Sequence, residues 1–380
     1  MLYLTMTYFI KLILTFILLF TTGVSAKNYL LDQNVTLFID EMVSQHDFNK
    51  TKLDKLFSEV DYQQTALSFY DKSIKPLPDK CKAKKYGTKC KANGAWDRYS
   101  HNIVGLQSVK KGKAYMRKHR KTLNRAYKKY GVLPEYIIAI IGIESYYGAN
   151  VGKYPVFDTL TTLAFEPNRR NKFFKSELKA FLIMTKKEKT NPLSIKGSYA
   201  GAIGLGQFMP SNFKKLAVDF DNDGKVSLND PDDAIGSIAH YLKKSGWKKG
   251  QEIAIPVFFF GERYTERETG FRHKYSRKAL KKLRPKRATR YNGPIYLIKL
   301  ERDNHDELWY GTKNFFAITR YNHSNYYAMS VHHLAQKIMG RDVSQPNNMK
   351  KGDFVVSDDN IGSIFAPSSS KIGRKFIIEL

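Results

Sequence analysis

Cysteine is almost absent from this chain, which has only Cys81 and Cys90 among its 380 residues. No histidine pair lies near them to complete a zinc site. We therefore expect the two cysteines to form a local, structural disulfide in an oxidising compartment.

Extended apolar runs are also scarce near the N-terminus. One run covers residues 10–20, broken only by Lys11 and Thr15, and it is short for a membrane span. Small residues follow up to Ala26, so residues 1–26 are expected to be a signal peptide cleaved after Ala26, which places the protein in the periplasm. No cysteine lies near that cleavage site, which excludes lipid anchoring there. An uncleaved N-terminal anchor and a translation start at Met6 remain alternatives.

Acidic residues are few compared with basic ones. The chain has 64 Lys and Arg against 35 Asp and Glu, a net charge of +29. Such an excess favours anionic partners such as cell wall, an anionic envelope surface or nucleic acid, and a solvated lysine-rich surface is the alternative. Residues 272–290 are strongly basic but contain no recognised nucleic-acid motif and follow a secretion signal, so nucleic acid is not expected.

The composition is otherwise that of a folded globular protein, with 42% hydrophobic and 26% charged residues. Periodicity predicts helices first and a β-rich part from residue 252 onward. Helices are expected at 111–130, 134–147, 172–188, 211–218, 231–245 and 326–339. Strands are expected at 253–260, 294–300 and 315–319.

Glu144 is the strongest catalytic candidate. It lies three, four and seven residues after Ile141, Ile140 and Ile137, on the same face of an almost entirely apolar helix. A carboxyl group in such surroundings is desolvated, so its pKa should rise and it can hold a proton near neutral pH. A general acid that protonates a glycosidic oxygen needs this property. A structural glutamate paired with a buried arginine is the alternative.

A second signal is a glycine-rich stretch at residues 196–211, KGSYAGAIGLGQFMPS. Its glycine spacing fits neither a phosphate loop nor a dinucleotide-binding motif. The glycines indicate that the backbone approaches something closely, or that the stretch is a tight turn between helices.

Together these stretches resemble the lytic murein transglycosylase B family (glycoside hydrolase family 103). The resemblance is carried by GIESYYG around Glu144, the run at 197–211, ITRYNHSNYYA at 318–328, WDRY at 96–99 and FEPNRR at 165–170. It covers residues 30 to 341, with the motifs in the family's order.

The resemblance implies a mainly α (α+β) protein with a lysozyme-like helical catalytic core, flanking helical segments and a small β domain. It also implies cleavage between N-acetylmuramic acid and N-acetylglucosamine without water, giving 1,6-anhydro sugars. Glu144 matches the family's single acid–base residue. The implied domains are 27–133 (helical), 134–250 (core), 251–313 (β domain), 314–345 (return to the core) and 346–380 (tail).

The same resemblance assigns substrate-binding residues. Ser198 and Gln207 match polar residues near the reacting sugar, and Phe208 matches an aromatic wall of the cleft. Arg169 and Arg170 match a pair suited to the carboxylates of peptide stems. The residues that match sugar-binding positions are Tyr99, Tyr321 and Asn322.

An acidic loop at residues 219–230 follows the EF-hand pattern, with Gly224 at its sixth position. The positions that would bind calcium are Asp219, Asp221, Asp223, Lys225 (through its carbonyl), Ser227 and Asp230. Aspartate stands at the twelfth position, where glutamate is usual, so weak binding is expected. The ion would brace the core, and the chemistry requires no cofactor. A solvated acidic turn is the alternative.

The leading hypothesis is thus a peptidoglycan lytic transglycosylase, a lyase acting on murein glycan strands. Alternatives are a lysozyme-type hydrolase, which needs a second carboxylate such as Asp158, Glu166 or Glu177 near the first, a non-catalytic wall-binding protein and a nucleic-acid binder. Cell-wall synthases are candidate protein partners.

Overall fold

The computed structural model describes residues 26–70, 94–101, 103–341 and 343. These fall into two compact units: a smaller one of residues 26–70 and 151–215, and a larger one of residues 94–150 and 216–343. The expected signal peptide up to Ser25, the cysteine pair and the C-terminal tail lie outside the described residues. None of the described helices combines the length and the apolarity needed to cross a membrane.

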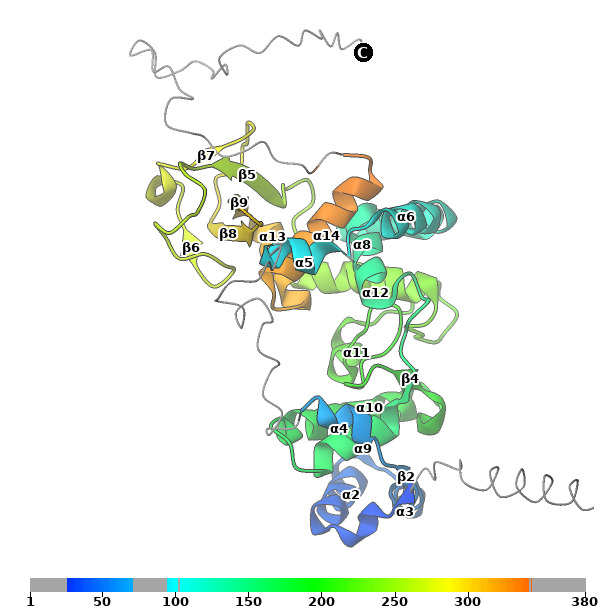
Figure 1. The fold of residues 1–380 in the computed structure, drawn as a ribbon. Helices are drawn as coiled ribbons and strands as arrows, with labels where there is room; N and C mark the ends of the chain where they lie inside the picture. Colours follow the sequence, from blue (N-terminus) through cyan, green and yellow to red (C-terminus); the bar gives the residue numbers. More distant parts are fainter. Residues whose placement is uncertain (1–25, 71–93, 102, 342, 344–380) are drawn as a thin grey trace, which may run out of the picture. The chain divides into compact units, whose positions relative to one another are not determined.

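The smaller unit is helical (Figure 1). Its main helices α9 (Val156–Phe165) and α10 (Asn171–Lys187) pack against each other, and α4 (Gln64–Ser68) packs on α9. The remaining elements are η1 (Tyr29–Leu31), α2 (Gln33–His46), α3 (Lys50–Ser58), η2 (Pro192–Ser194), α11 (Pro210–Leu216, whose last residue belongs to the larger unit), and the paired short strands β1 (Ala26–Lys27) with β2 (Val60–Asp61) and β3 (Tyr154–Pro155) with β4 (Lys196–Gly197).

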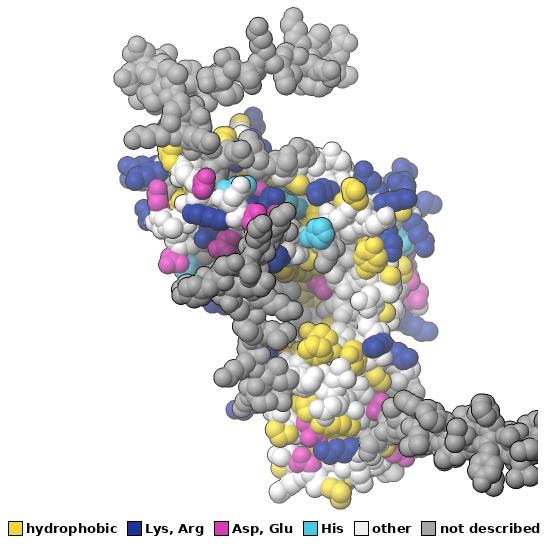
Figure 2. Space-filling model, viewed as in Figure 1, with side chains coloured by type: hydrophobic (Ala, Val, Ile, Leu, Met, Phe, Trp, Pro, Cys, Tyr) yellow, Lys and Arg dark blue, Asp and Glu magenta, His cyan; other side chains and the backbone are white. Residues whose placement is uncertain are grey.

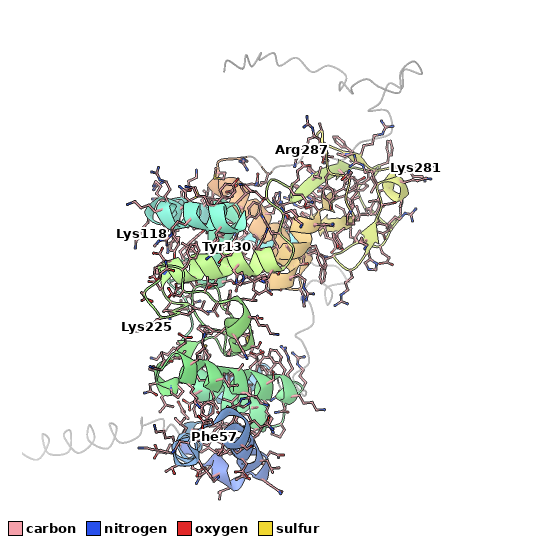
Figure 3. All side chains as sticks on the ribbon, turned by 180° about the vertical axis from the view of Figure 1, so that it is seen from behind. Phe57, Lys118, Tyr130, Lys225, Lys281 and Arg287 are labelled. Carbon is pink, nitrogen blue, oxygen red and sulfur yellow. The ribbon has the colours of Figure 1, made fainter. Side chains whose placement is uncertain are left out.

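The core of the smaller unit is rich in phenylalanine. Phe57 packs edge-to-face against Phe38, Phe157 and Phe165, at centroid separations of 6.0, 5.2 and 6.4 Å. Edge-to-face packing is a preferred arrangement of aromatic rings and adds to the free energy gained by their burial. The label of Phe57 in Figure 3 marks this cluster, which joins the N-terminal helices to α9.

The larger unit combines helices with a five-stranded antiparallel sheet of order β6-β8-β9-β5-β7. The strands are β5 (Ala254–Phe258), β6 (Lys274–Tyr275), β7 (Arg284–Pro285), β8 (Ile295–Glu301) and β9 (Asp306–Gly311), with η3 (Lys278–Leu280) between β6 and β7. The helices are α5 (Ala95–His101), α6 (Leu106–Lys118), α7 (Arg120–Tyr130), α8 (Pro134–Ser145), α12 (Pro231–Lys244), α13 (Lys313–Tyr321) and α14 (Asn325–Ile338).

The central helix α8 forms for reasons visible in its sequence. Pro134 occupies the first helical position, where its missing N–H costs nothing. Eight of the ten residues from Glu135 to Glu144 are buried, because α6, α12 and α14 all pack against this helix. Tyr146 ends the helix in the left-handed conformation, with φ of 50°.

Most predicted elements agree with the structure, but one helix is divided, one strand is wrong and several elements were not predicted. The expected helix at 111–130 is two helices, α6 and α7, because His119 leaves helical geometry with φ −103° and ψ 22°. The expected strand at 315–319 is wrong: these residues belong to α13, which Thr312 caps by accepting a hydrogen bond from the Asn314 N–H. Helices α5 and α9 and strands β6, β7 and β9 were not predicted.

The fold class is confirmed as mainly helical with a small sheet. The two compact units cut across the four domains expected from the sequence: residues 134–250 are divided between both units, whereas the sheet lies within the larger one. The boundaries of those four domains remain predictions.

Candidate active site

Glu144 lies in the last turn of α8 and is partly buried. The sequence suggested a glutamate enclosed on one apolar face, whereas the structure leaves part of the side chain accessible. Burial of the carboxyl group raises its pKa from 4.5 to about 7, against the lowering effect of a hydrogen bond from Tyr327. Near neutral pH, the carboxyl can therefore be present in both its protonated and its ionised form.

Tyr327 is the partner of this carboxyl group. Its hydroxyl donates to Oε1 of Glu144 at 2.6 Å from the first turn of α14, which packs against α8. Ser324 caps α14 by accepting a hydrogen bond from the Tyr327 N–H and so fixes the start of that helix. Sequence reasoning did not select Tyr327, although it lies within the matched stretch 318–328.

Two of the predicted sugar-binding tyrosines belong to the same cluster. The ring of Tyr321 is nearly parallel to that of Tyr327, with 6.4 Å between centroids and 6° between planes. Burial, and then the charge of Glu144, raises the pKa of Tyr99 and of Tyr321. All three hydroxyls therefore stay protonated at neutral pH and can act as hydrogen-bond donors. Asn322, at the end of α13, is exposed.

The backbone before Glu144 has little room for change. A Cβ atom on Gly142 would lie 2.6 Å from the ring of Tyr147, and the Tyr147 hydroxyl donates to the Ser108 carbonyl at 2.7 Å. This close approach ties α8 to α6. The glycine two residues before Glu144 thus serves the packing that fixes the position of the carboxylate.

The other predicted substrate-binding residues lie in the smaller unit. Ser198 Oγ accepts hydrogen bonds from the N–H groups of Ala200 and Ala202, at 3.3 and 3.0 Å. Gln207 has φ of 50° and donates from Nε2 to the carbonyls of Val151 and Gly204, both at 3.0 Å. Both side chains therefore organise the glycine-rich loop.

Phe208 and the two arginines differ in exposure. The side chain of Phe208 is only 2% exposed, so most of its ring packs within the protein, and its role as a wall of the cleft stays a prediction. Arg169 and Arg170 are exposed, and the Arg170 guanidinium lies 4.0 Å from the centroid of the Phe173 ring.

The acidic loop brings carboxylates together in the larger unit. Oxygen atoms of Asp219, Asp221 and Asp233 lie within 4.8 Å of one another, as do those of Asp221, Asp230 and Asp232. Asp233 is 2% exposed, lies beyond the twelve-residue motif and accepts hydrogen bonds from the N–H groups of Phe220 and Ser227, at 2.6 and 2.7 Å. Burial raises the pKa of Asp233, and the nearby charges of Asp221 and Asp230 raise it further.

These residues suit a hard cation such as calcium, since they supply several oxygen ligands whose mutual repulsion a cation would relieve. Asp230 also caps α12 by accepting hydrogen bonds from the N–H groups of Asp232 and Asp233. The motif pointed to Asp230 as the closing ligand, and the structure adds Asp233 as a candidate. Gly224, with φ of 86°, allows the turn.

The basic surface of the larger unit is seen in Figure 2, where Lys and Arg side chains gather over the sheet and α6. Lys281 and Arg287, both labelled in Figure 3, are exposed. This surface matches the positive net charge of the sequence.

Comparison with known proteins places the chain in a family. Residues 31–336 match the transglycosylase SLT domain. The chain is 38% identical to membrane-bound lytic murein transglycosylase B of Escherichia coli (strain K12) over 312 residues, 80% of this chain and 82% of that protein. The structure of the Escherichia coli lytic transglycosylase Slt35 in complex with calcium is similar with a TM-score of 0.73 and 36% identity, covering 84% of this chain and 97% of that one. The lytic transglycosylase SltB1 from Pseudomonas aeruginosa gives a TM-score of 0.69 with 34% identity, covering 81% and 97%. The chain belongs to the transglycosylase SLT-domain family, as the motifs around Glu144 predicted.

Proposed function

We propose that this lytic transglycosylase cleaves the bond between N-acetylmuramic acid and N-acetylglucosamine in peptidoglycan, with Glu144 as its single acid–base residue. The protonated carboxyl of Glu144 donates its proton to the glycosidic oxygen as the bond from that oxygen to C1 breaks. The resulting carboxylate then accepts the proton of the C6 hydroxyl of the muramic acid while O6 bonds to C1. The products are a 1,6-anhydro sugar and a new hydroxyl on the leaving sugar, and no water is consumed.

The observation that carries this proposal is the burial of the Glu144 carboxyl group, which raises its pKa to about 7. A group that donates a proton and then takes one back works best when its pKa lies near the working pH. Tyr327 holds the carboxyl in place through one hydrogen bond of 2.6 Å. An ion pair would instead keep the carboxyl ionised, and none of the described cations makes one with Glu144.

The surroundings of Asp158, Glu166 and Glu177, the candidates for a second catalytic carboxylate, also favour a mechanism with one carboxylate. Asp158 accepts a hydrogen bond from the Asp61 N–H at 3.2 Å, and Glu166 forms an ion pair with Lys27. Glu177 is 3% exposed and accepts two hydrogen bonds from Ser211. Each of these three has a structural partner within the smaller unit, which favours the lyase over a two-carboxylate hydrolase.

The remaining assignments follow from the resemblance and form part of the proposal. Tyr99, Tyr321 and Asn322 bind sugar, and Arg169 and Arg170 bind the carboxylates of peptide stems. Calcium, held by Asp219, Asp221 and Asp233 with further oxygen ligands from the loop, neutralises the acidic loop and braces it against α12 without taking part in the chemistry. The enzyme works in the periplasm, where its substrate lies.

Mass spectrometry of the products from purified sacculi tests the proposal, with the full chain and its Glu144→Gln variant compared side by side. Anhydromuropeptides, one water lighter than hydrolysis products, are expected from the wild type alone. Products with reducing ends would show that the protein is a hydrolase and would contradict the mechanism with a single carboxylate. Absence of any product from folded protein would favour a wall-binding role.

A further inference from the structure

The smaller unit carries an exposed aromatic pair that the reaction described above does not use. Phe69 follows α4, and Tyr199 lies in the glycine-rich loop, 130 residues later in the chain. Their ring centroids are 4.3 Å apart with 33° between the planes, and the residues are 54% and 40% exposed. Among the described aromatic side chains only Phe69, Tyr146, Tyr199 and Phe260 are exposed, so two rings that pack against each other and both face solvent are unusual.

Tyr199 is held rigidly despite its exposure. Within the turn that presents it, the Ser198 N–H donates to the Ala202 carbonyl and the Gly201 N–H donates to the Ser198 carbonyl, both at 2.9 Å. The Ser198 hydroxyl closes the turn further by accepting from two N–H groups. Gly201 has φ of 80°, and a Cβ atom there would lie 2.5 Å from Leu160, so the turn is packed onto α9.

Tyr70, which follows Phe69 in the chain, is itself packed into the smaller unit. The Tyr70 side chain is 8% exposed and packs edge-to-face on Phe174 of α10, with 4.8 Å between centroids. The centroid of Tyr70 also lies 6.3 Å from that of Tyr199. The turn that carries Tyr199 and the residue next to Phe69 are therefore both fixed by packing, so binding to the two exposed rings would cost little conformational entropy.

Two arginine side chains lie close to the rings of Tyr70 and Phe174. The Arg169 guanidinium is 6.0 Å from the centroid of the Tyr70 ring, and the Arg170 guanidinium lies over Phe173 and Phe174. Burial and Tyr199 raise the pKa of the Tyr70 hydroxyl overall. The charges of both arginines act in the opposite direction, because both lie close to this ring. Neither guanidinium makes an ion pair with a carboxylate in the described residues, so both can bind an anionic ligand.

We propose that Phe69 and Tyr199, together called the aromatic shelf, form a binding subsite for peptidoglycan, in which the apolar face of a sugar ring stacks on the shelf and the carboxylates of its peptide stem bind Arg169 and Arg170. An aromatic surface next to guanidinium groups matches a ligand that has both a sugar ring and a carboxylate. This inference rests on the proposed function for the nature of the ligand. It adds two residues that the sequence motifs did not select.

Binding is measured in the Glu144→Gln background, so that no substrate is consumed. The probes are a tetrasaccharide of N-acetylglucosamine, which has no carboxylate, and a tetrasaccharide of alternating N-acetylglucosamine and N-acetylmuramic acid that carries peptide stems. Phe69→Ala and Tyr199→Ala should each weaken binding of both probes by roughly five- to ten-fold, the size expected for loss of an aromatic contact. Arg169→Ala should weaken binding of the stem-bearing probe only.

Conservative variants separate stacking from a loss of structure. Tyr199→Phe and Phe69→Tyr keep a ring and should bind as the parent does, whereas Phe69→Leu should resemble Phe69→Ala. Leu37→Ala, which removes a side chain exposed to 58% on α2 of the same unit, is the matched control and should change nothing. Equal affinities of the parent and both alanine variants would overturn the proposal, as would a loss in Tyr199→Phe equal to that in Tyr199→Ala.

A failure of the aromatic shelf proposal can be distinguished from a failure of the proposed function. If the wild type gives anhydromuropeptides but the shelf variants bind normally, the shelf assignment alone fails. If the shelf variants lose affinity while the wild type gives hydrolysis products, the subsite stands and the lyase mechanism fails.

Discussion

The larger unit holds acidic groups in two contrasting settings. Glu144 lies in the last turn of the apolar helix α8, where the Tyr327 hydroxyl donates to its carboxyl and burial raises its pKa to about 7. The loop at 219–233 gathers several carboxylates, which accept hydrogen bonds mainly from backbone N–H groups. An isolated, desolvated carboxyl suits proton transfer, whereas clustered carboxylates suit a cation. The same chemical group thus takes different roles according to what surrounds it.

The largest expected effect comes from removing the proton carrier. Glu144→Gln keeps the size of the side chain and an oxygen that can accept from Tyr327, but it cannot transfer a proton. We expect the turnover rate on sacculi to fall by about 10³-fold or more, which is within the range of general acid–base catalysis. The melting temperature should stay the same or rise, since a desolvated carboxyl is lost. If turnover stayed within ten-fold of the wild type, Glu144 would not be the proton carrier, and its contrast with the acidic loop would not hold.

Calcium should act on the loop and leave the proton carrier unchanged. At 100 times its dissociation constant, a ligand of the folded state adds about 2.7 kcal/mol to the free energy of unfolding, so the melting temperature should rise by roughly 5 °C. Asp221→Asn should reduce that rise, measured by thermal unfolding with calcium and with a chelator. Lys225→Ala is the control, because position seven of the motif binds through its carbonyl. Equal calcium responses in wild type and Asp221→Asn would show that the loop does not hold the ion.

Stability should depend on pH through Glu144. Because folding raises its pKa from 4.5 to about 7, the folded state binds this proton more tightly than the unfolded state. The resulting stabilisation is fully present below about pH 4.5 and is lost as the pH rises through about 7. After allowance for partial exposure, we expect about 1–2 kcal/mol.

Urea unfolding of wild type and Glu144→Gln between pH 4.5 and 8 isolates this contribution. Asp158, whose pKa burial raises to about 6, is present in both proteins and cancels in the difference. A difference in the free energy of unfolding that stays constant with pH would mean that the carboxyl is not desolvated.

The sequence predicted those properties of the site that depend on residues close together along the chain. The apolar spacing around Glu144 indicated a raised pKa, and the acidic spacing at 219–230 indicated a cation site. It did not predict contacts between segments that lie far apart in the chain. Tyr327 lies 183 residues from Glu144, and only the packing of α14 on α8 brings them together. Asp233 lies on α12, outside the motif that defines the loop.

Misjudged elements have a similar cause. Residues 315–319 are β-rich in composition, yet Thr312 caps a helix there and α12 and α14 pack against it. Local preference gives way to tertiary packing there.

The smallest expected effect tests the hydrogen bond from Tyr327 to the Glu144 carboxyl. The hydroxyl of Tyr327 favours the ionised carboxyl and so lowers its pKa, against the larger effect of burial. Tyr327→Phe should therefore raise the pKa above 7, move the pH–rate profile toward alkaline pH by roughly half a unit to one unit, and reduce the maximal rate by about ten-fold or less. Tyr310→Phe is a matched control, since it removes another buried hydroxyl, which donates to the Leu283 carbonyl at 2.9 Å in the sheet. It should lower stability but leave the profile in place. A move of the Tyr327→Phe profile toward acid pH would mean that the hydroxyl stabilises the protonated carboxyl, and the acid–base cycle would then need a different account of how the proton returns to Glu144.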